Sequence, residues 1–461
     1  MTSYSKDRDR LTSKPSKGGS EYEYTGPEVW RALVLHPDLR GEPSSRAAES
    51  SLEEAVGLAQ AIELDVVWQE AVRLNRPKAA TLFGGGVVER MAGVIKAEDI
   101  GVAVVDSDLS PVQQRNLEKA WDCKVIDRTG LILEIFGERA KTHEGRLQVE
   151  LAALNYQRSR LVRSWTHLER QRGGAGFMGG PGERQIELDR RMIDERITRI
   201  KTDLKQVART RGLHREARQR VPYPVVALVG YTNAGKSTLF NRLTSSAVFA
   251  KDLLFATLDP TMRRLTLPGG QDIILSDTVG FISNLPTHLV AAFRATLEEV
   301  LEADLILHVR DIAHPETLAQ KDDVTAVLED LGVNPEDDAT NIVEVWNKID
   351  LLPPGDRERI VAQARNQPGQ IAVSATEGEG MDTLLESVQG NLNQLNEEVE
   401  LEIDLTDGAT IAWLYEHGEV KARHDDERHA HLRVSLAPRN LERLVRRHGG
   451  KLPEARSGAA G

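Results

Sequence analysis

The 461-residue chain contains a single cysteine, Cys123, and only 5% aromatic residues. One cysteine excludes an intramolecular disulfide framework and any zinc site built from several cysteines. No stretch approaches the roughly 18 consecutive apolar residues that a membrane-spanning helix needs. Residues 1–23 are polar and lack the apolar core of a signal peptide, so we expect a disordered tail and a cytoplasmic protein.

The net charge is −12, which would argue against a nucleic-acid partner if it were evenly spread. It is uneven, because between Arg158 and Arg220 basic residues outnumber acidic ones by about two to one. Such a segment is either an electrostatic footprint for nucleic acid or a solvated helix face with its own ion pairs. The charge pattern alone leaves both interpretations open.

Residues 24–144 alternate short β-rich runs with helical patterns. Strands are predicted at residues 32–35, 65–68 and 102–105, and helices at 52–61 and 111–121. This alternation is typical of a small parallel α/β domain. The string Gly84-Gly85-Gly86 is interpreted as a turn between elements.

Residues 145–222 contain two long amphipathic patterns around a Gly-rich segment, Gly173 to Gly182. The spacing predicts an antiparallel helical hairpin. Its tip carries Phe177 and Met178 between flanking arginines, a combination that suits stacking against nucleic-acid bases. A plain linker is the alternative for this segment.

The strongest signal is the phosphate loop, Gly230 to Ser237, which follows the apolar run Val225 to Val229. Glycines let backbone N–H groups turn toward phosphates, Lys236 can reach the β and γ oxygens, and the Ser237 hydroxyl can ligate Mg²⁺ at a helix N-terminus. The loop therefore predicts a nucleoside triphosphate site.

Three later motifs each follow a predicted strand. Asp277 could hold Mg²⁺ through water, and the Gly280 N–H could contact the γ-phosphate. In Asn347-Lys348-Ile349-Asp350, the carboxylate would accept from guanine N1–H and the N2 amine together. Adenine lacks both donors, and a polar pocket can reject such an analogue by roughly 10⁴-fold. Finally, Ser374-Ala375 could offer the Ala375 N–H to the guanine oxygen, so these motifs predict GTP as the ligand.

The order of these motifs resembles that of Ras-like, translation-factor-related GTPases. Longer strings narrow the resemblance to the HflX-type, ribosome-associated GTPases of the Obg/HflX-like group. They are Arg128 to Leu133, Thr142 to Gly145, Trp165 to Gln171, Gly180 to Glu183, Phe255 to Thr261 and Asp277 to Ile282. The resemblance covers nearly the whole chain from about Tyr24.

The resemblance implies a Ras-like P-loop GTPase domain at 223–392, preceded by the small parallel α/β domain and the hairpin, and followed by an α+β domain at 393–461. It implies a cytoplasmic monomer that binds the 50S subunit and its 23S rRNA and dissociates stalled or idle ribosomes under stress. The alternative is a GTP-dependent RNA chaperone or protein-binding regulator that acts away from ribosomes.

The expected ligands are GTP or GDP and Mg²⁺. The metal ligands are expected to be Ser237, Thr257 and Asp277, and the catalytic residues Lys236, Thr257, Asn233 and Gly280. By the same resemblance, Thr257 is the threonine that closes on Mg²⁺ and the γ-phosphate. The expected nucleotide-binding set is Gly230, Tyr231, Thr232, Asn233, Ala234, Gly235, Lys236, Ser237, Thr238, Phe255, Ala256, Thr257, Leu258, Asp259, Asp277, Thr278, Val279, Gly280, Asn347, Lys348, Asp350, Ser374 and Ala375.

Two positions bear on mechanism. Ras-like GTPases usually place a water-orienting Gln after the glycine of the second switch, whereas here Phe281 follows Gly280. Phenylalanine cannot hydrogen-bond water, so slow turnover without a partner is predicted. Asn233 occupies the position at which some GTPases coordinate K⁺, and a loop-capping asparagine is the alternative.

The first domain departs from the family pattern, because Gly84-Gly85-Gly86-Val87 stands where members commonly carry Gly-x-Gly-Lys. We therefore assign no second nucleotide site there.

In the last segment, strands are predicted at 412–415 and 432–436 and a helix at 439–448.

Overall fold

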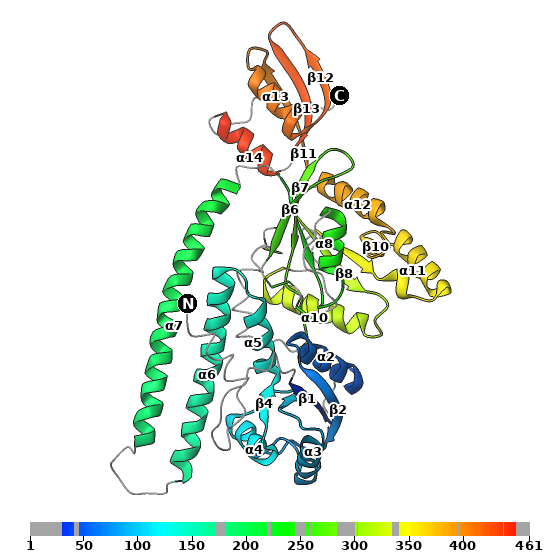
Figure 1. Ribbon diagram of the computed structural model, residues 1–461. Helices are drawn as coiled ribbons and strands as arrows, with labels where there is room; N and C mark the ends of the chain where they lie inside the picture. Colours follow the sequence, from blue (N-terminus) through cyan, green and yellow to red (C-terminus); the bar gives the residue numbers. More distant parts are fainter. Residues whose placement is uncertain are drawn as a thin grey trace, which may run out of the picture. The chain divides into compact units, whose positions relative to one another are not determined.

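The computed structural model describes residues 30–40, 46–171, 181–218, 223–244, 254–255, 257–258, 260–283, 300–301, 303–333, 341–394, 396–436 and 438–448. Its strands form three separate sheets, one of them mixed, and the predicted α/β multidomain fold is confirmed (Figure 1). In the described part of the chain, no helix has the length and apolar character required to cross a membrane.

The first sheet is fully parallel, with the strand order β2-β1-β3-β4. The predicted alternation of strands and helices is confirmed, whereas the turn predicted at Gly84-Gly85-Gly86 is wrong in part, because Gly85 and Gly86 begin α3 and Gly84 is its N-cap. Its elements are β1 (Arg31–Leu39), α2 (Ala48–Ala61), β2 (Asp65–Leu74), α3 (Gly85–Ala97), β3 (Val102–Val105), α4 (Pro111–Trp121), β4 (Lys124–Asp127) and α5 (Arg128–Arg139). Ala32 to Leu35 of β1 are fully buried because helices cover both faces of a parallel sheet.

The two longest helices are α6 (His143–Gln171) and α7 (Pro181–Arg218). Two ion pairs show that they run antiparallel: Arg158 contacts Asp194 at 3.1 Å, and Arg196 contacts Glu150 at 2.7 Å. Ile197 and Ile200 of α7 are buried. The helical hairpin is therefore confirmed, whereas its predicted tip falls mostly on residues 172–180, outside the described residues.

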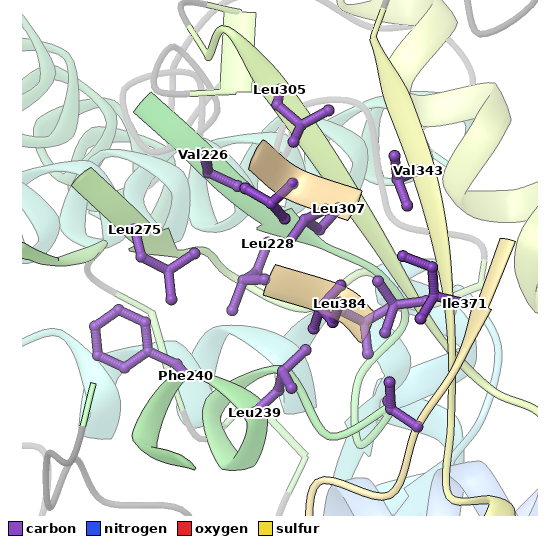
Figure 2. Close-up of a cluster of buried hydrophobic side chains, with 14 of the residues drawn as sticks. Val226, Leu228, Leu239, Phe240, Leu275, Leu305, Leu307, Val343, Ile371 and Leu384 are labelled. Atoms are coloured by element: carbon purple, nitrogen blue, oxygen red, sulfur yellow. The ribbon is translucent and has the colours of Figure 1, made fainter. Parts of the chain in front are cut away.

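The second sheet has the order β10-β9-β8-β5-β7-β6, in which only β6 is antiparallel to its neighbour. Side chains of its strands meet Leu239 and Phe240 of α8 and Leu384 of α12 in one core (Figure 2). The elements are β5 (Val225–Val229), α8 (Lys236–Thr244), β6 (Thr261–Thr266), β7 (Asp272–Asp277), β8 (Leu305–Asp311), α10 (Thr317–Asp330), β9 (Ile342–Asn347), η1 (Ile349–Leu351), α11 (Pro354–Asn366), β10 (Gln370–Ala372) and α12 (Met381–Gln394).

A polar cluster lies on β8 and β9 beside α10. Glu344 accepts from Arg310 at 2.6 Å, from the Trp346 indole at 3.0 Å and from Lys321 of α10 at 2.5 Å. These donors hold the pKa of Glu344 at about 2 against the opposing effect of burial. His308 lies beside Glu344 in the ladder and is 4% exposed, and burial lowers its pKa to about 4 although Glu344 opposes the shift.

We expect the domain to lose stability as the pH falls from about 7 to about 5. Unfolded His308 takes up a proton near its ordinary pKa of about 6.5, whereas the folded form resists protonation until about pH 4. The unfolded state therefore binds more protons in this window, which costs about 2 kcal/mol of unfolding free energy at pH 5. Urea titrations followed by tryptophan fluorescence measure this, and a His308→Gln variant should lack that part of the loss. An equal loss in both proteins would contradict the assignment.

The third sheet is antiparallel, in the order β11-β13-β12. Its elements are β11 (Glu397–Asp404), α13 (Gly408–His417), β12 (Glu419–Asp425), β13 (His429–Leu436) and α14 (Pro438–Arg447). The α+β class, the strand at 432–436 and the last helix are confirmed. The strand predicted at 412–415 is wrong, because these residues lie inside α13, whose first turn is capped by the Asp407 side chain accepting from Thr410 N at 3.0 Å.

Candidate functional site

The phosphate loop connects β5 to α8, as its sequence predicts. Two of its glycines are required by the backbone. Gly230 has φ +151°, and a Cβ there would collide with the Val309 carbonyl oxygen. Gly235 has φ +92°, and a Cβ there would collide with the Asn347 amide. The loop can therefore adopt this path only with glycine at both positions.

Lys236 is buried at the start of α8 and folds back over the loop. Its Nζ donates to the carbonyl oxygens of Gly230 at 3.0 Å and Tyr231 at 2.8 Å. Burial lowers the pKa of Lys236 to about 8, and the nearby Asp277 opposes that shift. Among the described residues, this ammonium group donates hydrogen bonds to two neutral carbonyl oxygens, so an anionic phosphate would be a stronger partner.

Three side chains from separate segments meet beside Lys236. The Ser237 hydroxyl donates to Asp277 Oδ2 at 2.7 Å and lies 2.8 Å from the Thr257 hydroxyl, which in turn donates to the same carboxylate oxygen at 2.9 Å. Asp277 is fully buried, and its second oxygen has no hydrogen bond with the described residues. Burial raises the pKa of this carboxyl. Hydroxyl and carboxylate oxygens are the ligands Mg²⁺ prefers, so the three fit that metal.

The segment after β7 lies directly against the phosphate loop. Phe281 N donates to Gly230 O at 3.1 Å, and Thr232 N donates to Phe281 O at 2.7 Å. A Cβ on Gly280 would lie 2.9 Å from the Thr232 Cα and 3.0 Å from Lys236 Nζ, so glycine is needed for this approach. The Phe281 side chain is 2% exposed, so the residue after Gly280 is an apolar group packed in the core. Thr278 donates to Leu228 O at 2.6 Å, and Val279 is buried.

Asn347 joins the phosphate loop to the segment after β10. Its amide nitrogen donates to Ala234 O at 2.9 Å, and its amide oxygen accepts from Ala375 N at 3.0 Å. The sequence predicts that this N–H contacts the guanine oxygen, which would therefore compete with Asn347 for it. Ser374 is buried beside it.

Asp350 lies on η1, two residues beyond Lys348. Thr376 donates to one of its oxygens at 3.4 Å. The other oxygen is buried and has no hydrogen-bond partner within the ranges that the structure describes. This oxygen therefore keeps an unused capacity to accept a hydrogen bond.

Asn233 has φ +58°, a left-handed conformation that asparagine tolerates better than most residues. Its exposed side chain makes no hydrogen bond with the described residues. The side-chain hydrogen bond expected of a loop-capping asparagine is therefore not present among them. Phe255 and Leu258 are buried and Thr238 is half-buried, whereas Ala256 and Asp259 lie outside the described residues. The sequence analysis missed Asp311, whose carboxylate contacts Lys348 at 2.8 Å. The sequence signal that could have identified Asp311 is an acidic residue at the end of a largely apolar strand.

Four consecutive parts of the chain match known families. Residues 49–137, 139–218, 225–348 and 359–457 match those described as GTP-binding GTPase N-terminal, GTP-binding GTPase middle region, 50S ribosome-binding GTPase and HflX C-terminal domain. The chain is 50% identical over 415 residues to the GTPase HflX of Magnetococcus marinus, covering 90% of this chain and 94% of that relative. It is 47% identical over 319 residues to the GTPase HflX of Escherichia coli, covering 69% and 73%.

Proposed function

Because the chain belongs to the HflX family of GTPases, we propose that it is a GTP-controlled factor that binds the 50S subunit in the cytoplasm and dissociates stalled or idle ribosomes under stress. The observation that carries this proposal is the match of residues 225–348 to a family described as 50S ribosome-binding GTPase, since that stretch holds most of the candidate site. GTP is the substrate, and GDP and phosphate are the products.

In the proposed mechanism, the N–H groups and Lys236 of the phosphate loop bind and orient the β- and γ-phosphates. Ser237, Thr257 and Asp277 would hold Mg²⁺, which when bound offsets charge on the phosphate oxygens. The Gly280 N–H would contact the γ-phosphate, so that loss of this group on hydrolysis releases the segments around Thr257 and Phe281. Asn347 and Asp350 would select guanine.

Turnover by the free protein is expected to be slow, because the buried Phe281 cannot orient the attacking water. We propose that the 50S subunit supplies or orders the missing group. Measuring phosphate release with and without purified 50S subunits tests this, and we expect a clear acceleration. Equal rates of phosphate release with and without 50S subunits would contradict the proposal. Purified 30S subunits serve as the control particle.

Asn233 is proposed to ligate K⁺, which would stabilise charge on the transferring phosphate as an arginine finger does. This is supported by its exposed side chain, which makes no hydrogen bond with the described residues. Replacing KCl by NaCl should slow turnover, and Asn233→Ala should remove the difference between the two salts. Identical rates of the wild type in both salts would count against a K⁺ site.

The exposed basic side chains of helix α7 support the proposal that the protein contacts 23S rRNA within the 50S subunit. Five of its exposed basic side chains form no ion pair with the described residues, namely Arg191, Arg199, Lys201, Lys205 and Arg209. Exposed cations that have no ion-pair partner among the described residues suit a phosphate backbone better than a self-neutralised helix surface does.

We further propose that the protein acts as a monomer.

A co-sedimentation experiment distinguishes action on ribosomes from the alternative, a GTP-dependent RNA chaperone or protein-binding regulator. The protein should travel with 50S particles in a non-hydrolysable GTP analogue and not in GDP. Binding only to free RNA or to another protein would favour the alternative.

A further inference from the structure

We infer that Asp311, at the end of β8, is a positioning residue for guanine recognition, which it serves by holding Lys348 and thereby the turn that presents Asp350. This inference rests on the proposed guanine site. Neither the motif pattern nor the resemblance assigns a role to Asp311.

The end of β8 is fixed to the end of β9. The two strands are parallel neighbours, and Asp311 is the ladder partner of Asn347. One residue further on, Ile312 N donates to Asn347 O at 3.1 Å. Asp311 therefore lies beside the start of the loop that contains Asn347, Lys348 and Asp350.

The loop makes its decisive bend at Lys348, whose backbone has φ +66° and ψ +33°. A residue with a Cβ adopts this left-handed conformation only at a cost in free energy, so contacts elsewhere in the structure must hold it. Lys348 Nζ contacts Asp311 Oδ2 at 2.8 Å, and both side chains are largely buried, at 22% and 13% exposed. The bend leads at once into η1 and Asp350, so its geometry sets where the Asp350 carboxylate points.

Asp311 is itself held in place. Its other oxygen, Oδ1, accepts from Ala313 N at 3.1 Å. One carboxylate oxygen thus anchors to its own turn while the other holds Lys348. A partly buried pair with both ends fixed loses little side-chain entropy on forming, unlike an exposed surface pair.

The test uses Asp311→Asn, which keeps an acceptor for Ala313 N and removes the charge that holds Lys348. GDP and IDP are compared as ligands, because hypoxanthine lacks only the N2 amine that Asp350 is proposed to bind. We expect GDP affinity to fall about tenfold and IDP affinity to fall less, so that the GDP-to-IDP preference shrinks. Lys348→Met should have the same effect, and the double variant should add little to either single one.

Lys321→Met is the matched control, because it removes another lysine–carboxylate pair, between α10 and Glu344 of β9, without touching the guanine loop. Its GDP-to-IDP preference should equal that of the wild type. If Asp311→Asn weakens GDP and IDP by the same factor, Asp311 has only a structural role and the inference is overturned. If Asp350→Ala leaves the preference of the wild type unchanged, the proposed guanine contact itself fails, a separate outcome.

Discussion

Replacing Asp350 by asparagine is expected to move the base preference of this GTPase from guanine to xanthine. The carboxylate is proposed to accept from guanine N1–H and the N2 amine, and an amide would present its own N–H₂ group to that amine. Two charge-assisted hydrogen bonds at about 1.5–3 kcal/mol each are lost, so GDP affinity should fall about 10³-fold. Xanthine carries an oxygen in place of the amine and can accept from the new amide. Competition of GDP and XDP against a fluorescent guanine nucleotide measures both effects.

Asp356→Asn is the matched control for this substitution. Asp356 is an exposed carboxylate on the following helix, α11, where it pairs with Arg359 at 2.9 Å. That variant should bind GDP as the wild type does and should gain no affinity for XDP. A variant at Asp350 that lost GDP without gaining XDP would show that the residue supports the fold of the loop and does not contact the base.

Much of this site could be predicted from the sequence, because its chemistry is local. The phosphate loop is a contiguous string between a strand and a helix, and its two conformationally required glycines, Gly230 and Gly235, are part of the string itself. Asp277, Asn347 and Asp350 each follow an apolar run. Since parallel strands bring their carboxyl ends to one edge of a sheet, the convergence of these residues follows from the parallel direction of their strands, whatever their order.

Contacts that depend on which strands are neighbours could not be predicted. The hydrogen bonds of Asn347 to Ala234 and Ala375, and the contact of Asp311 with Lys348, exist because β8 and β9 are paired and β10 lies beside β9. Nothing in the spacing of the chain specifies that order. Because the strand order is not specified by the sequence, the competition between guanine and Asn347 for the Ala375 N–H could not be predicted either.

The incorrect strand at 412–415 has a different cause. Four apolar or aromatic residues in a row fit a buried strand and a helix segment equally well. The deciding signal was upstream, in Asp407, whose side chain caps the first turn of α13. Weighing the cap against the short apolar run would have predicted the helix.

Removing the Ser237 hydroxyl is expected to reduce GTP turnover by about 10²–10³-fold, and to shift its Mg²⁺ dependence to higher concentration. The hydroxyl lies 2.7 Å from Asp277 and 2.8 Å from the Thr257 hydroxyl, so Ser237→Ala takes one oxygen from a set of three. Because burial raises the pKa of Asp277, a cation at this site is also what would favour its ionised form. Turnover measured across a MgCl₂ titration reports both changes.

Thr244→Val provides the control, since it removes a hydroxyl from the other end of α8, where the group donates to Phe240 O at 2.7 Å. Its Mg²⁺ midpoint should match that of the wild type. If Ser237→Ala also kept the wild-type midpoint, Ser237 could not be a ligand of the catalytic metal. The three oxygens would then serve only to hold the segment containing Thr257 against β7, and the metal would have to reach the phosphates without them.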